Sequence, residues 1–122
     1  MGKPQGRTLV IHVRSDVATD PPGQCYVDCK TVSVYTPDHQ KLRWVSDDGK
    51  KYIVDFEKGS GFPNPDPGTP FKDGQGNPKH TLSTADTELE PTGPHGYYYY
   101  SVKGPNGNIC LKPEDPGVHV TP

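Results

Sequence analysis

The stretch LRWVSDDGKKYIVDF, residues 42–56, decides the fold class. On each side of its centre, apolar residues recur at every second position: Leu42, Trp44, Tyr52, Val54 and Phe56. A period of two is typical of a β-strand with one buried face. Between the two runs, Asp47-Asp48-Gly49 supplies a glycine that tolerates positive φ, as a tight hairpin requires. The stretch therefore predicts two strands joined as a β-hairpin.

The same alternation elsewhere in the chain predicts further strands. They cover residues 8–13, 30–35, 96–103, 108–111 and 118–120. Residues 80–90 have a weaker pattern, which fits a short strand or a helical turn. Turn signals such as Pro105-Asn106-Gly107 separate these runs, and no run has a convincing helical period. We therefore expect an all-β fold, an antiparallel β-sandwich of seven to eight short strands.

A long loop rich in proline and glycine interrupts the strand pattern at residues 57–80. It contains five prolines and five glycines, and proline lacks the backbone donor that helices and inner strands need. Loops of this length within a compact domain are usually functional or mobile. Phe62 and Phe71 lie near the ends of its proline cluster and would tie the loop to the body. With 122 residues, the chain is long enough for one modest core, so we expect a single domain spanning residues 1–122.

Three segments resemble the cupredoxins, the small β-sandwiches that hold blue copper. WVSDDGKKYIVDF (44–56) resembles their hairpin, and residues 96–102 resemble the strand that leads into the copper-binding cysteine. The terminal GVHVTP (117–122) is similar to their closing strand. The resemblance covers about half of the chain and implies a Greek-key, cupredoxin-like β-sandwich.

The copper ligands that this resemblance implies are absent. A blue-copper site needs two imidazoles and a thiolate, usually with an axial thioether. The resemblance places the first histidine at Tyr52 and the cysteine at Val102, and residues 101–113 supply neither a second histidine nor a methionine. The five histidines are scattered, and Cys25-x3-Cys29 has no second pair at zinc spacing. We therefore expect no metal site and no cofactor.

The three cysteines are an odd number, so at least one thiol has no partner within the chain. In a continuous strand, Cys25 and Cys29 would be roughly 13 Å apart at about 3.3 Å per residue. A disulfide needs Cα atoms within about 7 Å. We expect three reduced, partly buried thiols, and the alternative is a bridge between Cys110 and either Cys25 or Cys29.

Charge and motifs exclude several function classes. The formal net charge is −2 with both signs interspersed, which argues against a nucleic-acid partner. The longest apolar run, residues 9–11, is far below the roughly 20 residues that span a bilayer, so no membrane insertion is expected. The chain has no GxSxG, HExxH or phosphate-cradling motif, and we predict that it is not an enzyme. No signal peptide follows Met1, which favours a cytoplasmic location, with a mature secreted domain as the alternative.

The four tyrosines at 97–100 suggest the function. Alternation puts Tyr98 and Tyr100 in the core and leaves the other two on the outer face. Tyrosine offers a large contact area and a hydroxyl at low entropic cost, which suits a protein or glycan partner. The predicted recognition surface comprises Phe62, Phe71, Tyr97 and Tyr99. The alternatives are a self-assembling structural subunit, formed by strand addition between copies, and a metal-binding electron carrier with displaced ligands.

Overall fold

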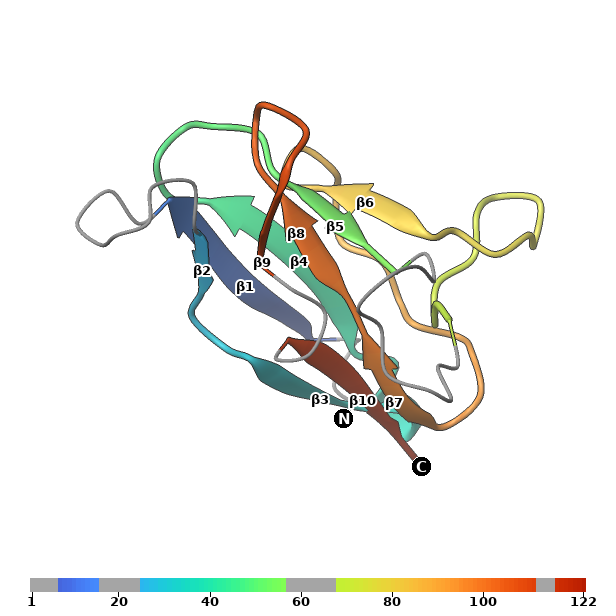
Figure 1. Ribbon diagram of the computed structural model, residues 1–122. Helices are drawn as coiled ribbons and strands as arrows, with labels where there is room; N and C mark the ends of the chain where they lie inside the picture. The colour runs from blue at the N-terminus through green and yellow to red at the C-terminus, as the bar shows by residue number, and fades with distance from the viewer. Residues whose placement is uncertain (1–6, 16–24, 57–67, 112–115) are drawn as a thin grey trace.

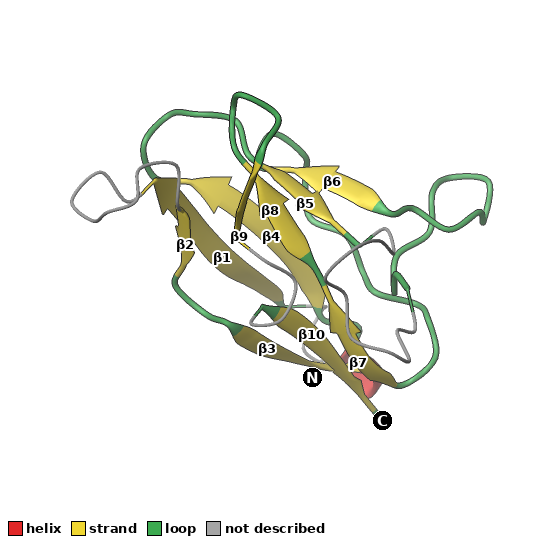
Figure 2. Ribbon diagram, viewed as in Figure 1, coloured by secondary structure: helices red, strands yellow, loops and turns green. Residues whose placement is uncertain are grey.

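The protein is all-β, as the sequence predicts. The computed structural model describes residues 7–15, 25–56, 68–111 and 116–122. These residues form ten strands in three sheets, one 3₁₀ turn at Thr36–Asp38 and no α-helix (Figures 1 and 2). No described segment is therefore a helix long and apolar enough to cross a bilayer.

The three sheets have the strand orders β2-β1-β4, β3-β10-β7 and β6-β5-β8-β9. The strands are β1 (Thr8–Ser15), β2 (Cys25–Val27), β3 (Thr31–Tyr35), β4 (Lys41–Ser46), β5 (Ile53–Asp55), β6 (Thr81–Ser83), β7 (Gly96–Tyr99), β8 (Ser101–Lys103), β9 (Ile109–Leu111) and β10 (Gly117–Thr121). In Figure 1 the sheet β3-β10-β7 lies below the other two, and β8 continues upward from β7.

The strand pairing is mixed, whereas the sequence predicted an antiparallel sandwich. β1 and β4 run parallel with Ile11 opposite Trp44, and β3 and β10 run parallel with Val32 opposite Val118. Parallel neighbours need a long crossover connection. The chain provides one between β1 and β4, because it folds back as β2, enters another sheet as β3 and then returns.

The predicted hairpin at residues 42–56 is wrong in its pairing, although both of its strands exist. β4 pairs with β1, whereas β5 lies between β6 and β8. The turn therefore crosses from one sheet to another, with Gly49 at the expected positive φ of 76°. The apolar faces explain this arrangement, because Trp44 and Phe56 meet at 6.3 Å between ring centroids across the core. Two strands side by side in one hairpin would not face each other in this way.

The structure has more strands than the expected seven or eight, because the predicted run at 96–103 divides and β2 lies where the sequence predicted no strand. The run at 96–103 breaks at Tyr100, where the backbone N–H binds the carbonyl oxygen of Pro116 at 3.2 Å. Before the break β7 pairs with β10, and after it β8 pairs with β5 and β9. The region at 25–35 similarly passes from β2 in one sheet to β3 in another. Both segments hold neighbouring sheets together.

An aromatic cluster fills the centre of the core. Trp44 and Tyr100, far apart in sequence, pack at 5.4 Å between ring centroids, and the Trp44 Nε1–H donates to the Tyr100 hydroxyl at 3.3 Å. Phe56 and Phe71 complete the cluster, and none of the four side chains is more than 1% exposed. Phe71 thus anchors the end of the proline-rich loop in the core. Phe62, the other predicted anchor, lies outside the described residues.

A disulfide joins Cys25 of β2 to Cys110 of β9, so the expectation of three reduced thiols is wrong. The two Cα atoms are 5.2 Å apart, although 85 residues separate them in sequence. The bridge is one of the two alternatives, and it forms because β2 and β9 approach each other from different sheets. Cys29 keeps a free thiol, which donates to the carbonyl oxygen of Thr31 at 3.0 Å.

Candidate functional site

The outer face of the sheet β3-β10-β7 carries two of the predicted binding residues, and we call it the tyrosine face. Its side chains alternate along the strands with buried core residues, except that Gly117 is itself covered. The tyrosine face comprises Thr31, Ser33, Tyr35, Tyr97, Tyr99, Gly117, His119 and Thr121. The register places Gly117 between Thr31 and Tyr99 on neighbouring strands.

Tyr97 and Tyr99 lie together on this face. Their ring centroids are 4.6 Å apart and their planes meet at 72°. The hydroxyl of Tyr97 hydrogen-bonds with Thr31 Oγ1 at 3.1 Å, and the His119 ring lies 6.2 Å from the Tyr97 ring. Both tyrosines are partly exposed. The hydrogen bond to β3 fixes the direction in which Tyr97 extends across the sheet.

Gly117 lets the Tyr97 ring rest on the sheet backbone. A Cβ atom at Gly117 would lie 2.5 Å from Cζ and 2.6 Å from both Cε2 and Oη of Tyr97. No larger residue fits there unless the ring moves. Because Gly117 pairs with Tyr99 while Tyr97 pairs with His119, the ring covers the glycine diagonally across two strands. An aromatic side chain covering a cross-strand glycine is a known device for stabilising a sheet.

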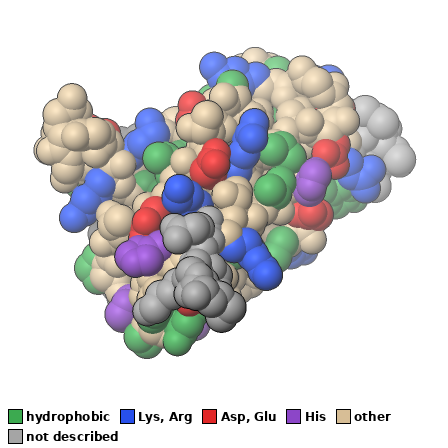
Figure 3. Space-filling view, turned by 180° about the vertical axis from the view of Figure 1, so that it is seen from behind, with side chains coloured by type: hydrophobic (Ala, Val, Ile, Leu, Met, Phe, Trp, Pro, Cys, Tyr) green, Lys and Arg blue, Asp and Glu red, His purple; other side chains and the backbone are tan. Residues whose placement is uncertain are grey.

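The tyrosine face has no acidic, lysine or arginine side chain among its described residues. The outward positions of β1 and β4 differ, since they include Arg14, Lys41 and Arg43. Figure 3 shows basic and acidic side chains interspersed on the side of the molecule opposite to the view of Figure 1. The lack of charge is therefore a feature of the tyrosine face and not of the whole surface.

The structure does not bring Phe71 to this face, and Phe62 lies outside the described residues. Phe71 is 1% exposed and packs on Trp44 at 6.1 Å, so a partner cannot reach it. His119 lies on the solvent side of β10 beside Tyr97, and sequence reasoning did not identify it as part of this face. The alternation in GVHVT could have predicted which side chains of β10 point outward. Only the register of β10 against β7 shows that His119 lies beside Tyr97.

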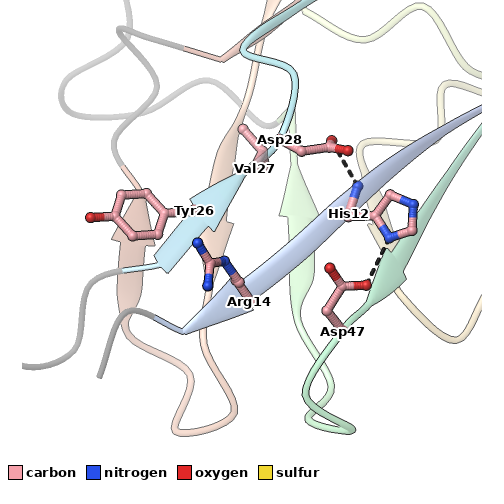
Figure 4. Close-up of a pocket in the computed structure, with 6 residues that line it drawn as sticks. All are labelled: His12, Arg14, Tyr26, Val27, Asp28 and Asp47. Atoms are coloured by element: carbon pink, nitrogen blue, oxygen red, sulfur yellow. Dashed lines mark hydrogen bonds and ion pairs between the residues drawn. The ribbon is translucent and has the colours of Figure 1, made fainter. Parts of the chain in front are cut away.

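A second candidate is a hollow of about 350 Å³ beside β1 and β2 (Figure 4). It is lined by His12, Arg14, Tyr26, Val27, Asp28 and Asp47. His12 Nδ1 lies 2.7 Å from Asp47 Oδ1, and Asp28 Oδ1 accepts the backbone N–H of His12 at 2.9 Å. Arg14 lies over the Tyr26 ring, 5.6 Å from its centroid.

The carboxylates of this hollow act mainly on His12. The hydrogen bond to Asp47 raises the pKa of His12, and the charges of Asp47 and Asp28 act in the same direction. The side chains of His12 and Asp47 are 45% and 46% exposed, so solvent weakens the pair. The residues of this hollow thus contact one another in the structure. We therefore do not propose the hollow as the binding site.

Asp48 anchors the crossover between β4 and β5 at the end of β1. Burial alone would raise the pKa of Asp48, but four hydrogen bonds hold it well below its usual range. Their donors are the backbone N–H groups of Ser15 and Lys50 and the hydroxyls of Ser46 and Tyr52. The Tyr52 hydroxyl also contacts the hydroxyl of Ser15. We assign this cluster a structural role, because its carboxylate is fully engaged in fixing the turn.

The described residues contain no group of three or more His, Cys, Asp or Glu side chains that could hold a metal ion. At the positions where the cupredoxin resemblance implies copper ligands, Tyr52 and Val102 are both fully buried. The phenol of Tyr52 binds Asp48, and Val102 belongs to the apolar core.

The chain matches no protein-family model, and comparisons with curated proteins and with solved structures find no significant match. The cupredoxin resemblance therefore stays a hypothesis that rests on three stretches of sequence. A function has to be argued from the residues of this chain alone.

Proposed function

We propose that the chain is a non-catalytic binding module that recognises a protein or glycan partner through the tyrosine face, on a copper-free, cupredoxin-like Greek-key scaffold. The observation that carries the proposal is the Tyr97–Tyr99 pair, packed at 4.6 Å on a sheet face whose described residues carry no acidic, lysine or arginine side chain. Aromatic rings with a hydroxyl combine contact area with hydrogen bonding.

Preorganisation of Tyr97 supports this function. The ring is held at its tip by Thr31 and from below by Gly117, so binding does not have to order it. Immobilising a rotamer-rich side chain costs about 0.5–1.5 kcal/mol on association. A fixed ring avoids most of this cost. Strands also position side chains more precisely than loops do.

The disulfide supports a role outside the cytoplasm. Structural disulfides form and persist in oxidising compartments and are rare in the cytosol. The Cys25–Cys110 bridge thus favours the mature secreted domain over the cytoplasmic location that the N-terminal residues suggested. Glycans and exposed protein surfaces are both available as partners in such a compartment.

A comparison of retained partners tests the proposal. The wild-type protein, a Tyr97→Ala/Tyr99→Ala variant and a Tyr26→Ala control are immobilised and exposed to the same mixture of extracellular proteins and glycans. Tyr26 is a matched control because it is 40% exposed but belongs to β2, outside the tyrosine face. We expect a component that the wild type and the control retain and the double variant loses. Equal retention by all three proteins would rule out the tyrosine face as the binding surface.

Self-assembly is the second candidate function. Among the described residues β9 pairs only with β8, and Ile109 on this edge strand is 51% exposed. Exposed apolar edge strands pair readily with other chains. Size-exclusion chromatography with light scattering separates the two candidates, since a monomer at high concentration contradicts the assembly.

A further inference from the structure

We propose that the partner of the tyrosine face is an uncharged glycan, bound with one sugar ring stacked on Tyr97 and a neighbouring edge against Tyr99. This inference rests on the proposed function, in which the tyrosine face is the binding surface. It follows from the orientation of the two rings, the lack of acidic, lysine and arginine side chains among the described residues of the face, and the size of the face.

The orientation of Tyr97 is fixed by its distances to Gly117. A Cβ atom placed on Gly117 would be almost equally far from Cζ, Cε2 and Oη, at 2.5–2.6 Å. A point in the plane of the ring at 2.5 Å from Cζ cannot have these distances to Cε2 and Oη, so the Cβ would lie above the plane. The ring therefore turns one face to the backbone and the other away from the sheet.

Tyr99 stands steeply against this ring. The 72° angle between the two planes means that, with Tyr97 lying over the sheet, Tyr99 is close to upright. In the proposed complex the Tyr97 ring over the sheet is the floor, and the steep Tyr99 ring, at a centroid separation of 4.6 Å, is the wall. The C–H groups on one face of a pyranose are slightly positive, and they are attracted to the negative face of an aromatic ring. A sugar can stack on the floor while its edge contacts the wall.

The polar groups around the rings are hydroxyls and one imidazole. The hydroxyls of Thr31, Ser33 and Thr121 and the imidazole of His119 lie on the same face. Sugar hydroxyls both donate and accept, as these side-chain hydroxyls do. Uronates and sulfates are usually bound by lysine or arginine, and the described residues of the face provide neither; His119 is the one basic side chain among them. The chemistry thus favours a neutral saccharide over an acidic one.

The area of the face favours a saccharide over a protein. The three strands lie about 4.8 Å apart, two with five residues and one with four, and at about 3.3 Å per residue they cover roughly 220 Å². A standard protein interface buries about 800 Å² on each partner. The described face by itself is therefore smaller than a standard protein interface, whereas two or three sugar rings would cover it.

Isothermal titration calorimetry with a panel of neutral and uronate oligosaccharides tests the inference. We expect at least one neutral oligosaccharide to bind the wild type, with at least a tenfold loss of affinity in Tyr97→Ala. Gly117→Ala is the sharper variant, because it displaces the ring without removing it, and we expect a similar loss. Tyr97→Phe, which keeps the ring, and Tyr26→Ala, outside the face, should keep most of the affinity. Far-UV circular dichroism checks that each variant is folded. If Gly117→Ala does not fold, the affinity of Tyr97→Ala alone tests the inference.

The outcomes separate this inference from the proposed function. If no neutral oligosaccharide binds, or if only uronates bind, the glycan inference is wrong. If in addition a protein is retained by the wild type and lost by Tyr97→Ala/Tyr99→Ala, the binding module stands with a different partner. If a neutral saccharide binds equally well to wild type, Tyr97→Ala and Gly117→Ala, both the inference and the tyrosine face as a binding surface are refuted.

Discussion

Replacing Trp44 by alanine should remove most of the stability of the domain. Trp44 is 1% exposed and lies within 6.3 Å, between ring centroids, of Phe56, Phe71 and Tyr100. Truncating a buried tryptophan costs about 3–5 kcal/mol. The substitution also leaves the Tyr100 hydroxyl without its Trp44 donor in the core, which adds about 1 kcal/mol. The sum is about 4–6 kcal/mol, against a total stability of about 5–15 kcal/mol for a typical domain.

Urea denaturation followed by far-UV circular dichroism measures this loss without using tryptophan as the probe. Trp44→Phe provides a graded comparison, because it keeps a ring between the three neighbours, and we expect it to cost less than half as much as Trp44→Ala. Tyr26→Ala, at a partly exposed position that contacts Arg14, should change the free energy of unfolding by no more than about 1 kcal/mol. A free energy of unfolding for Trp44→Ala within 1 kcal/mol of the wild type would refute the aromatic centre of the core.

Three further predictions concern the disulfide, a histidine and copper. Reducing Cys25–Cys110 opens a loop of 85 residues, and we expect a loss of about 4.5 kcal/mol, measured as a lower urea midpoint with dithiothreitol; an unchanged midpoint would contradict the bridge. The pKa of His12, raised by the hydrogen bond to Asp47, should fall in Asp47→Asn when followed by NMR, and an unchanged value would contradict the contact. Adding copper(II) should produce no intense thiolate charge-transfer band, and its appearance would contradict the copper-free proposal.

The sign of the pH effect at His12 follows from the direction of its pKa shift. The folded pKa lies above the ordinary value of 6.5, because Asp47 favours the imidazolium. The contribution of the pair to stability is therefore complete below pH 6.5 and disappears as the pH rises through the folded pKa. Since both side chains are about half exposed, the effect should be visible in the titration of His12 and small in the urea midpoint.

Alternation in the sequence predicted which side chains are buried, but it did not predict which strands pair. Leu42, Trp44, Tyr52, Val54 and Phe56 are all buried, as their period of two requires. The same period fits a hairpin and a crossover equally well, because a strand shows an apolar face to the core in either case. The choice is made by contacts far apart in sequence, such as the hydrogen bond from the Ser15 N–H to Asp48. A single sequence does not reveal these contacts.

For the candidate site, too, the sequence predicted the direction of side chains but not the contacts between strands. Tyr97 and Tyr99 could be placed on an outer face from the strand pattern alone. The role of Gly117 could not, because the register of β7 against β10 decides that the Tyr97 ring lies over it. Phe71 was predicted both to tie the proline-rich loop to the body and to belong to the recognition surface, and its burial confirms only the first of these predictions. In the structure its ring packs between Trp44 and Phe56, and such burial depends on how the loop returns to the core.

The four consecutive tyrosines connect the stability of the domain to the proposed binding surface. Tyr98 and Tyr100 point inward and are at most 2% exposed, so the backbone that carries Tyr97 and Tyr99 is fixed by the core. The outward rings then need only local support, which Gly117 and Thr31 supply for Tyr97. Along residues 97–100, the inward side chains thus stabilise the domain, whereas the outward side chains form the proposed binding surface. Substitutions at Tyr98 or Tyr100 should therefore reduce stability and binding together, whereas Gly117→Ala should act mainly on binding.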